Sequence, residues 1–108
     1  MGSGEGKLVK RFVDNSTLDR LRKVPVLVCL NELGAHIKVD QTYLPTTSKT
    51  TKRVHVNVAG HDWEFLVDGP KFYDTRGEVG GGGSLDLVMY LWQVTFKQAV
   101  KILVKAGV

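Results

Sequence analysis

Four consecutive glycines, at residues 80–83, divide the second half of the chain into two different patterns. The aromatic segment Lys71-Phe72-Tyr73 precedes them and is typical of a short strand. Apolar residues at helical spacing follow them, at Leu85, Val88, Met89 and Trp92. Because glycine adopts positive φ and lets other groups approach its backbone, we expect a tight strand-to-helix junction, with Ser84 as the helix N-cap. The residues after the glycines exclude a nucleoside-triphosphate P-loop, which needs Gly-Lys-Ser or Gly-Lys-Thr.

The length and charge of the chain suit one small basic domain. With 108 residues it can bury one core but not two. We expect residues 1–6 to be a disordered leader foreign to the native protein and residues 7–108 to form a single domain. Fifteen Lys and Arg against eleven Asp and Glu give a net charge of +4, a modest bias toward polyanionic partners.

Cysteine and apolar content indicate the cellular setting. The only cysteine, Cys29, lies in an apolar run, so we expect it to be buried and reduced. No apolar run reaches the ~20 residues that span a bilayer, and we find no signal peptide. The sequence therefore predicts a cytoplasmic protein.

Hydrophobic periodicity predicts helices at both ends of the chain and strands between them. Residues 15–22 form a helix that Asn15 or Ser16 can cap, and a second helix runs from Pro25 until Gly34 ends it. Two further helices follow the glycines. The last begins with a capping box, Thr95 with Gln98, and directs Phe96, Val100 and Leu103 inward.

Period-two alternation predicts the sheet. Apolar residues alternate with polar ones over residues 54–58 and 63–67, which indicates a hairpin, and residues 71–73 add a third strand. A fourth strand within residues 37–44 has a weaker pattern. We therefore predict an α+β fold, in which a small antiparallel sheet of three or four strands packs against two N-terminal and two C-terminal helices.

The sequence offers little for metal binding or catalysis. The three histidines, His36, His55 and His61, have no accompanying pair of thiolates. Asp74 and Glu78 are a conceivable Mg²⁺ pair, but no third ligand is evident, and no Gly-x-Ser-x-Gly motif is present. We expect no enzyme activity, no metal and no cofactor.

Aromatic residues on a sheet beside basic residues form the usual platform for unpaired bases. Trp63 and Phe65 are better suited to the core, which leaves Tyr73 as the exposed aromatic. The candidate nucleic-acid contacts are Lys49, Lys52, Arg53, Lys71, Tyr73, Arg76, Lys97 and Lys101. The alternatives are structural: residues 45–52 as a solvated loop, and the lysines of the last helix as a solvated face.

The segment from Lys71 to Val100 resembles the end of the zinc-ribbon domain of bacterial-type DNA primases, most closely the divergent form in plasmid and other mobile-element primases. The shared order is an aromatic strand, a glycine turn, a Leu-Asp-Leu helix start and a Phe-x-x-Ala-Val helix. Where zinc-binding members carry Cys-x-x-Cys, this chain has Thr75-Arg76-Gly77-Glu78, and the upstream Cys and His pair would fall near residues 55–58, with no cysteine. The degenerate ribbon is therefore expected to replace about 10 kcal/mol of coordination energy with apolar packing.

This resemblance implies a non-catalytic accessory protein for the DNA replication of a plasmid, phage or other mobile element. The domain would bind single-stranded DNA and assist a primase, polymerase or helicase. The alternative is a protein-interaction module or inhibitor that docks onto a replication or host-defence protein without binding DNA.

Overall fold

The computed structural model describes residues 14–46 and 48–108, and this part of the chain forms an α+β domain. A five-stranded antiparallel sheet has the order β1-β2-β3-β4-β5, so each strand pairs with its neighbour in sequence. The predicted fold class is confirmed, with one strand more than the three or four expected. The predicted leader, residues 1–6, lies outside the described residues.

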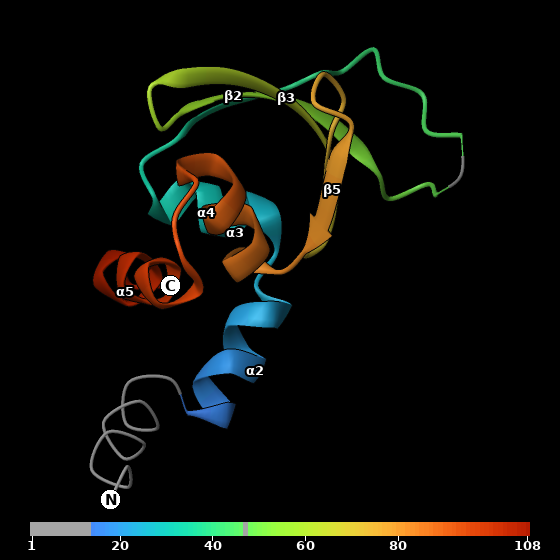
Figure 1. Ribbon diagram of the computed structural model, residues 1–108. Helices are drawn as coiled ribbons and strands as arrows, with labels where there is room; N and C mark the ends of the chain where they lie inside the picture. Colours follow the sequence, from blue (N-terminus) through green and yellow to red (C-terminus); the bar gives the residue numbers. More distant parts are fainter. Residues whose placement is uncertain (1–13, 47) are drawn as a thin grey trace, which may run out of the picture.

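Strands and helices follow one another in simple order (Figure 1). The helices before the sheet are α2 (Asn15–Lys23) and α3 (Val26–Glu32). The strands are β1 (His36–Val39), β2 (Lys52–Val58), β3 (His61–Asp68), β4 (Lys71–Asp74) and β5 (Val79–Gly82). The helices after it are α4 (Ser84–Trp92) and α5 (Phe96–Ala106).

The hairpin of β2 and β3 forms where the alternation predicts it. Ala59 and Gly60 at its tip have φ values of 56° and 78°, which suit a type I′ turn between right-twisted strands. The register places Val56 opposite Trp63. Both side chains therefore lie on the same side of the sheet.

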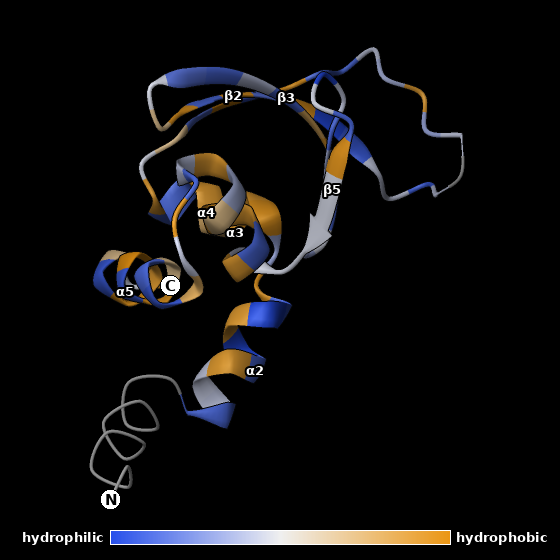
Figure 2. Cartoon of the chain, in the orientation of Figure 1, coloured by the Kyte–Doolittle hydropathy of each residue, from blue (hydrophilic) through white to orange (hydrophobic). Residues whose placement is uncertain are grey.

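All helices of the described chain lie on one side of the curved sheet (Figure 1). The strand residues on that side are buried, as the burial of Val54, Val56, Phe65 and Phe72 shows. They pack against α3 and α4, whose ribbons are largely hydrophobic in Figure 2. No helix of residues 14–46 and 48–108 lies on the opposite side of the sheet, which we call the outer face.

Local capping explains where three of the helices begin or end. The carboxylate of Asp14 accepts a hydrogen bond from the backbone N–H of Thr17, so Asp14 caps α2 and the prediction of Asn15 or Ser16 is wrong. Gly34, with φ of 79°, ends α3 in a Schellman turn, as predicted. The capping box of Thr95 is also confirmed.

The glycine run forms the edge strand β5 rather than a turn alone, and its ribbon is nearly colourless in Figure 2. Close approach explains why glycine is needed at Gly81, where a Cβ would lie 2.9 Å from Cε1 and Cζ of Phe72. The buried ring of Phe72 therefore occupies the space that a side chain on β5 would take.

The start of α4 differs from the prediction. Gly83 takes the N-cap position with φ of 92°, and a Cβ there would lie 3.1 Å from Cα of Arg22. Ser84 is the first helical residue and is buried, and its hydroxyl donates to the backbone carbonyl of Leu21 at 2.6 Å. The hydroxyl therefore links α4 to α2 where the two helices meet. An N-cap rule considers only neighbouring residues and cannot predict this tertiary contact.

Two further predictions concern burial. Cys29 is fully buried as expected, and burial raises the pKa of its thiol to about 12. Phe96 is 40 % exposed, so its predicted inward position is wrong, whereas Val100 and Leu103 are buried. No helix within residues 14–46 and 48–108 combines the length and apolar character needed to cross a membrane.

Candidate nucleic-acid interface

The outer face of the sheet is polar because every second strand residue points away from the helices. Alternation explains its composition: in β2 the buried Val54, Val56 and Val58 alternate with less buried polar residues. The outward side chains of β1 to β4 include His36, Lys38, Arg53, His55, Asn57, Asp62, Glu64, Leu66, Asp68, Lys71 and Tyr73.

Tyr73 is the exposed aromatic of this face, with 40 % of its surface accessible. It pairs with Leu66 on β3 and with Gly80 on β5. A Cβ on Gly80 would lie 3.2 Å from Cδ1 of Tyr73, so the absence of a side chain lets the ring lie against β5. Lys71, two residues earlier on β4, is on the same face and is also exposed.

Arg76 projects from the turn between β4 and β5, which Asp74 holds in place. The carboxylate of Asp74 accepts hydrogen bonds from the hydroxyl of Tyr90 and from the backbone N–H of Arg76. Burial alone would raise the pKa of Asp74, but these bonds and one from the N–H of Gly77 hold it below its usual value. The turn that presents Arg76 is therefore anchored to α4.

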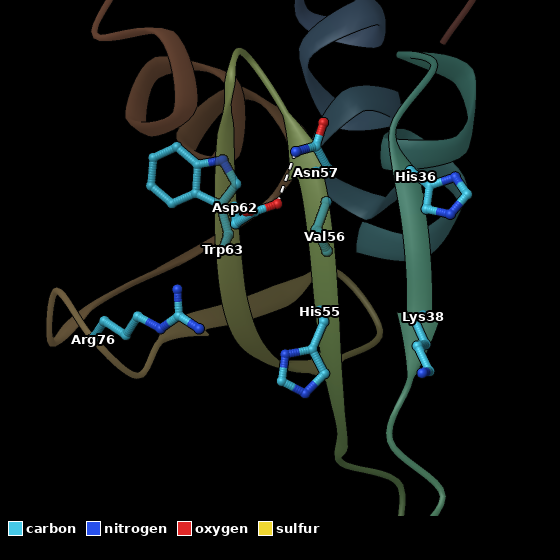
Figure 3. Close-up of a pocket in the computed structure, with 8 residues that line it drawn as sticks. All are labelled: His36, Lys38, His55, Val56, Asn57, Asp62, Trp63 and Arg76. Atoms are coloured by element: carbon cyan, nitrogen blue, oxygen red, sulfur yellow. Dashed lines mark hydrogen bonds between the residues drawn. The ribbon is translucent and has the colours of Figure 1, made fainter.

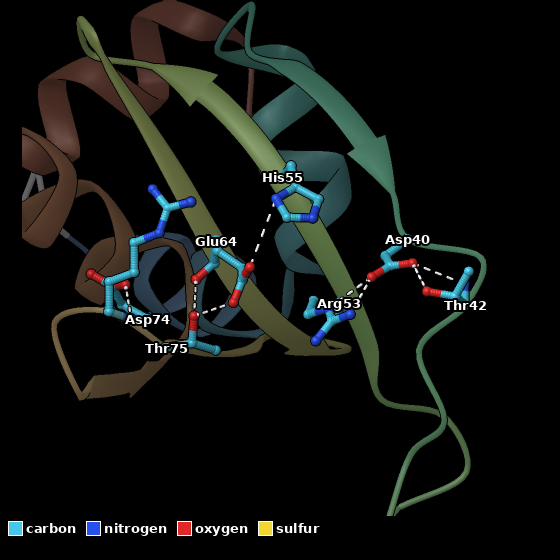
Figure 4. Close-up of polar contacts among 8 residues, drawn as sticks. Asp40, Thr42, Arg53, His55, Glu64, Asp74 and Thr75 are labelled. Carbon is cyan, nitrogen blue, oxygen red and sulfur yellow. Dashed lines mark hydrogen bonds and ion pairs between the residues drawn. The ribbon is translucent and has the colours of Figure 1, made fainter.

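Arg53 also lies on the outer face, but its charge is already compensated. Its Nε donates to Oδ2 of Asp40 at 2.8 Å, and its guanidinium lies 5.3 Å from the ring centroid of Tyr43. Hydrogen bonds from Thr42 and from Arg53 hold the pKa of Asp40 well below its usual range (Figure 4). Asp40 engages Nε and Nη2 of Arg53, so the guanidinium has fewer donors left for a phosphate than an unpaired arginine has.

Glu64 forms a second polar group near the centre of the face (Figure 4). Its Oε1 accepts a hydrogen bond of 2.6 Å from the hydroxyl of Thr75, and its Oε2 lies 3.9 Å from Nδ1 of His55. The carboxylate is thus engaged by neighbouring side chains and competes less with an arriving anion.

Three adjoining hollows cross the outer face. The central hollow has a volume of about 340 Å³ and is lined by His36, Lys38, His55, Val56, Asn57, Asp62, Trp63 and Arg76 (Figure 3). A hollow of about 480 Å³ shares Lys38 and His55 with it, and another of about 290 Å³ shares Asp62, Trp63 and Arg76. The shared walls join them into one trough across β3, β2 and β1.

The remaining predicted residues lie away from this face. Lys49 and Lys52 line a different hollow of about 450 Å³ at the end of β2, beside Pro25 and Leu27 of the α3 region. Lys97 and Lys101 lie on α5, which packs against α4 on the helical side. The structure therefore places Lys71 and Tyr73 together on one face of β4, whereas the side chain of Arg76 lies beside Asp62 and Trp63, toward the other end of β3. Lys97 and Lys101 are separate from them on the helical side, and Lys49 and Lys52 border Asp68, which pairs with Lys71 across β3 and β4.

Sequence reasoning missed three residues of the central hollow: His36, Lys38 and His55. A signal for two of them existed, since His36-Ile37-Lys38-Val39 alternates polar and apolar residues as a half-buried strand does. The pairing of Lys38 with His55 across β1 and β2 comes only from the register.

Within the described residues no group of three His, Cys, Asp or Glu side chains is placed to hold a metal ion. Asp74 is 4 % exposed and uses its carboxylate to anchor the turn, whereas Glu78 is exposed. The two carboxylates therefore do not form the conceivable Mg²⁺ pair.

No protein-family model matches the chain, and comparisons with curated proteins and with solved structures find no similar protein. Function is therefore inferred from the fold and from the side chains of the outer face.

Proposed function

We propose that this chain is a non-catalytic domain that binds single-stranded DNA on the outer face of its sheet. The observation that carries the proposal is the position of Tyr73, an exposed aromatic ring between Lys71 and the Arg76 turn on a face that no helix covers. An exposed ring offers a stacking surface to a base of any sequence, and adjacent cations bind the phosphates.

Lys71 and Arg76 are the cations that the proposal assigns to the phosphates of the strand. Within the described residues the side chains of Lys71 and Arg76 make no hydrogen bond or ion pair, although the charge of Lys71 acts on Asp68 and that of Arg76 on Asp74, so their N–H donors are available to phosphate oxygens. The carboxylates of Asp40 and Glu64, by contrast, are occupied by Arg53, Thr42 and Thr75. Binding of this kind releases counterions and weakens as salt rises.

The resemblance to primase zinc ribbons supports the same proposal and suggests the wider role. In the segment that replaces a zinc knuckle, Thr75 bonds to Glu64 and the preceding Asp74 bonds to Tyr90. Side-chain hydrogen bonds hold the turn at the place where relatives of that kind use a metal. We accordingly infer an accessory role beside a primase, polymerase or helicase of a plasmid, phage or other mobile element.

Fluorescence anisotropy with a labelled oligothymidylate tests the proposal at 50 mM and 200 mM salt. We expect binding at low salt that weakens at high salt, and a loss of about tenfold or more for Tyr73→Ala, since one stacked base contributes ~1–3 kcal/mol. Lys97→Ala is the matched control for Lys71→Ala, because it removes an equal charge from the helical side. Absence of binding at 50 mM salt, or binding that salt leaves unchanged, contradicts the proposal.

A protein-docking role is the second candidate, and α5 favours it. Phe96 and Val104 are 40 % and 48 % exposed on this helix, beside Lys97 and Lys105. Such an apolar and basic surface suits an acidic partner protein. Binding to a replication or host-defence protein that Val104→Asp abolishes and Tyr73→Ala leaves intact, without any DNA affinity, would establish this role instead.

A further inference from the structure

We propose that the central hollow is a phosphodiester-binding site, and that the strand crosses the sheet along the trough from Arg76 to Lys38. This inference rests on the proposed function and adds a path and two new contact residues, Lys38 and His55. It predicts that the strand extends beyond the Tyr73 platform on β4 toward β1 at the opposite edge of the sheet.

The cations of the central hollow approach it from two sides. Figure 3 shows Arg76 reaching in from one side, Lys38 on the other and His55 between them. Lys38 is directly opposite His55 in the register of β1 and β2. Within the described chain the side chains of Lys38 and Arg76 make no hydrogen bond or ion pair, although the charge of Arg76 acts on Asp74, so both have N–H donors available to phosphates in the hollow.

The acidic residue of the hollow does not oppose this arrangement strongly. Oδ1 of Asp62 accepts a hydrogen bond of 2.7 Å from Nδ2 of Asn57, directly opposite it on β2 (Figure 3). Glu64, the other nearby carboxylate, is bonded to Thr75. Among the residues that line the hollow itself, Lys38 and Arg76 give two positive charges against the one negative charge of Asp62, a positive balance even when both histidines are neutral.

The openness of the trough selects a strand over a free nucleotide. The hollow passes into one neighbour at Lys38 and His55 and into the other at Trp63 and Arg76. A chain that enters at one end can leave at the other, whereas a site for a small molecule encloses most of its ligand. The trough spans three strands, about 10 Å between the axes of β1 and β3, so it has room for more than one phosphate.

Anisotropy titrations of Lys38→Ala, Lys71→Ala and Lys97→Ala with oligothymidylate test the path. We expect Lys38→Ala to weaken binding about two- to fivefold, as for loss of one exposed ion pair, and to reduce the salt slope by about 0.7. Lys97→Ala, the control, keeps wild-type affinity. A Lys38→Ala protein that binds like the control, while Tyr73→Ala and Lys71→Ala weaken binding, overturns the path and leaves the proposed function standing. If the wild-type protein binds no DNA, both the strand path and the proposed function are contradicted.

Amide NMR titrations with thymidine monophosphate and with oligothymidylate separate the two sources of phosphate. The strand is expected to shift the amides of Lys38, His55 and Asn57 at much lower concentration than the monophosphate. Equal affinity for the two ligands at these amides overturns the assignment to a strand and identifies a nucleotide pocket instead. An unchanged urea midpoint shows that Lys38→Ala is folded, as the exposure of this residue predicts.

Discussion

The hydroxyl of Tyr90 on α4 donates a hydrogen bond to the carboxylate of Asp74 at the end of β4. The two residues are 16 positions apart, and their contact ties the helix layer to the turn that presents Arg76. The bond raises the pKa of Tyr90 to about 12. Stability and the geometry of the outer face are therefore linked at one point.

Tyr90→Phe should lower the free energy of unfolding at pH 7 by about 2 kcal/mol, because it removes a bond to a nearly buried carboxylate. The cost should shrink below pH 4, where Asp74 becomes protonated in the unfolded chain and then in the folded one. Urea unfolding at pH 7 and pH 3 measures both effects. Tyr73→Phe, which removes a hydroxyl without a partner in the described chain, should change stability by less than about 0.5 kcal/mol.

Gly81→Ala should destabilise the domain by about 1–3 kcal/mol, because the new methyl group would collide with the buried ring of Phe72. Gly82→Ala is the control on the same strand, since a Cβ there meets nothing within 4 Å. Thermal or urea unfolding of the two proteins should separate them clearly. Equal stability would show that β5 can move away from Phe72.

Acid should destabilise the domain through carboxylates that accept hydrogen bonds. Hydroxyls of Thr50 and Ser48 lower the pKa of Asp68, and Thr42 with Arg53 lowers that of Asp40. A lowered folded pKa stabilises the folded state above the unfolded value of about 3.9, and this contribution is lost as pH falls through the folded values. The urea midpoint should therefore fall below about pH 4, and Asp40→Asn with Asp68→Asn should flatten the profile. A midpoint constant from pH 7 to pH 2 contradicts this expectation.

The thiol of Cys29 should react with a disulfide reagent at pH 8 only when the domain unfolds, because the thiolate is the reactive form and burial raises the pKa to about 12. The reaction rate, followed by absorbance across a urea series, should increase at the unfolding midpoint. Fully denatured protein supplies the reference rate. Rapid stoichiometric reaction without urea would place the thiol at the surface.

Regular patterns made much of this fold predictable. Alternation over β2 and β3 gave the central hairpin, and Thr95 with Gln98 gave the start of α5. β5 was missed because glycine carries no hydrophobic signal, so a strand of Val79–Gly82 looks like a turn. Ser84 was misassigned because its hydroxyl bonds to a distant carbonyl rather than to its own helix.

The candidate site was predictable only where its residues are neighbours in sequence. Lys71 and Tyr73 are two residues apart and share one face of β4, as the alternation of a strand predicts, whereas Arg76 lies in the following turn and points toward Asp62 and Trp63 of β3. Lys97 shares their charge but sits behind the core, which composition does not reveal. Lys38 joins Arg76 in one hollow through the order of five paired strands, and that order is a property of the folded sheet.

Because helices cover only one side of the sheet, alternate residues of a strand respond differently to substitution. Substitutions at the buried Val54 or Val56 should affect folding, whereas substitutions at the exposed His55 or Asn57 should change the surface and leave the core intact. The chemistry of the outer face can therefore change one position at a time during evolution without loss of the fold.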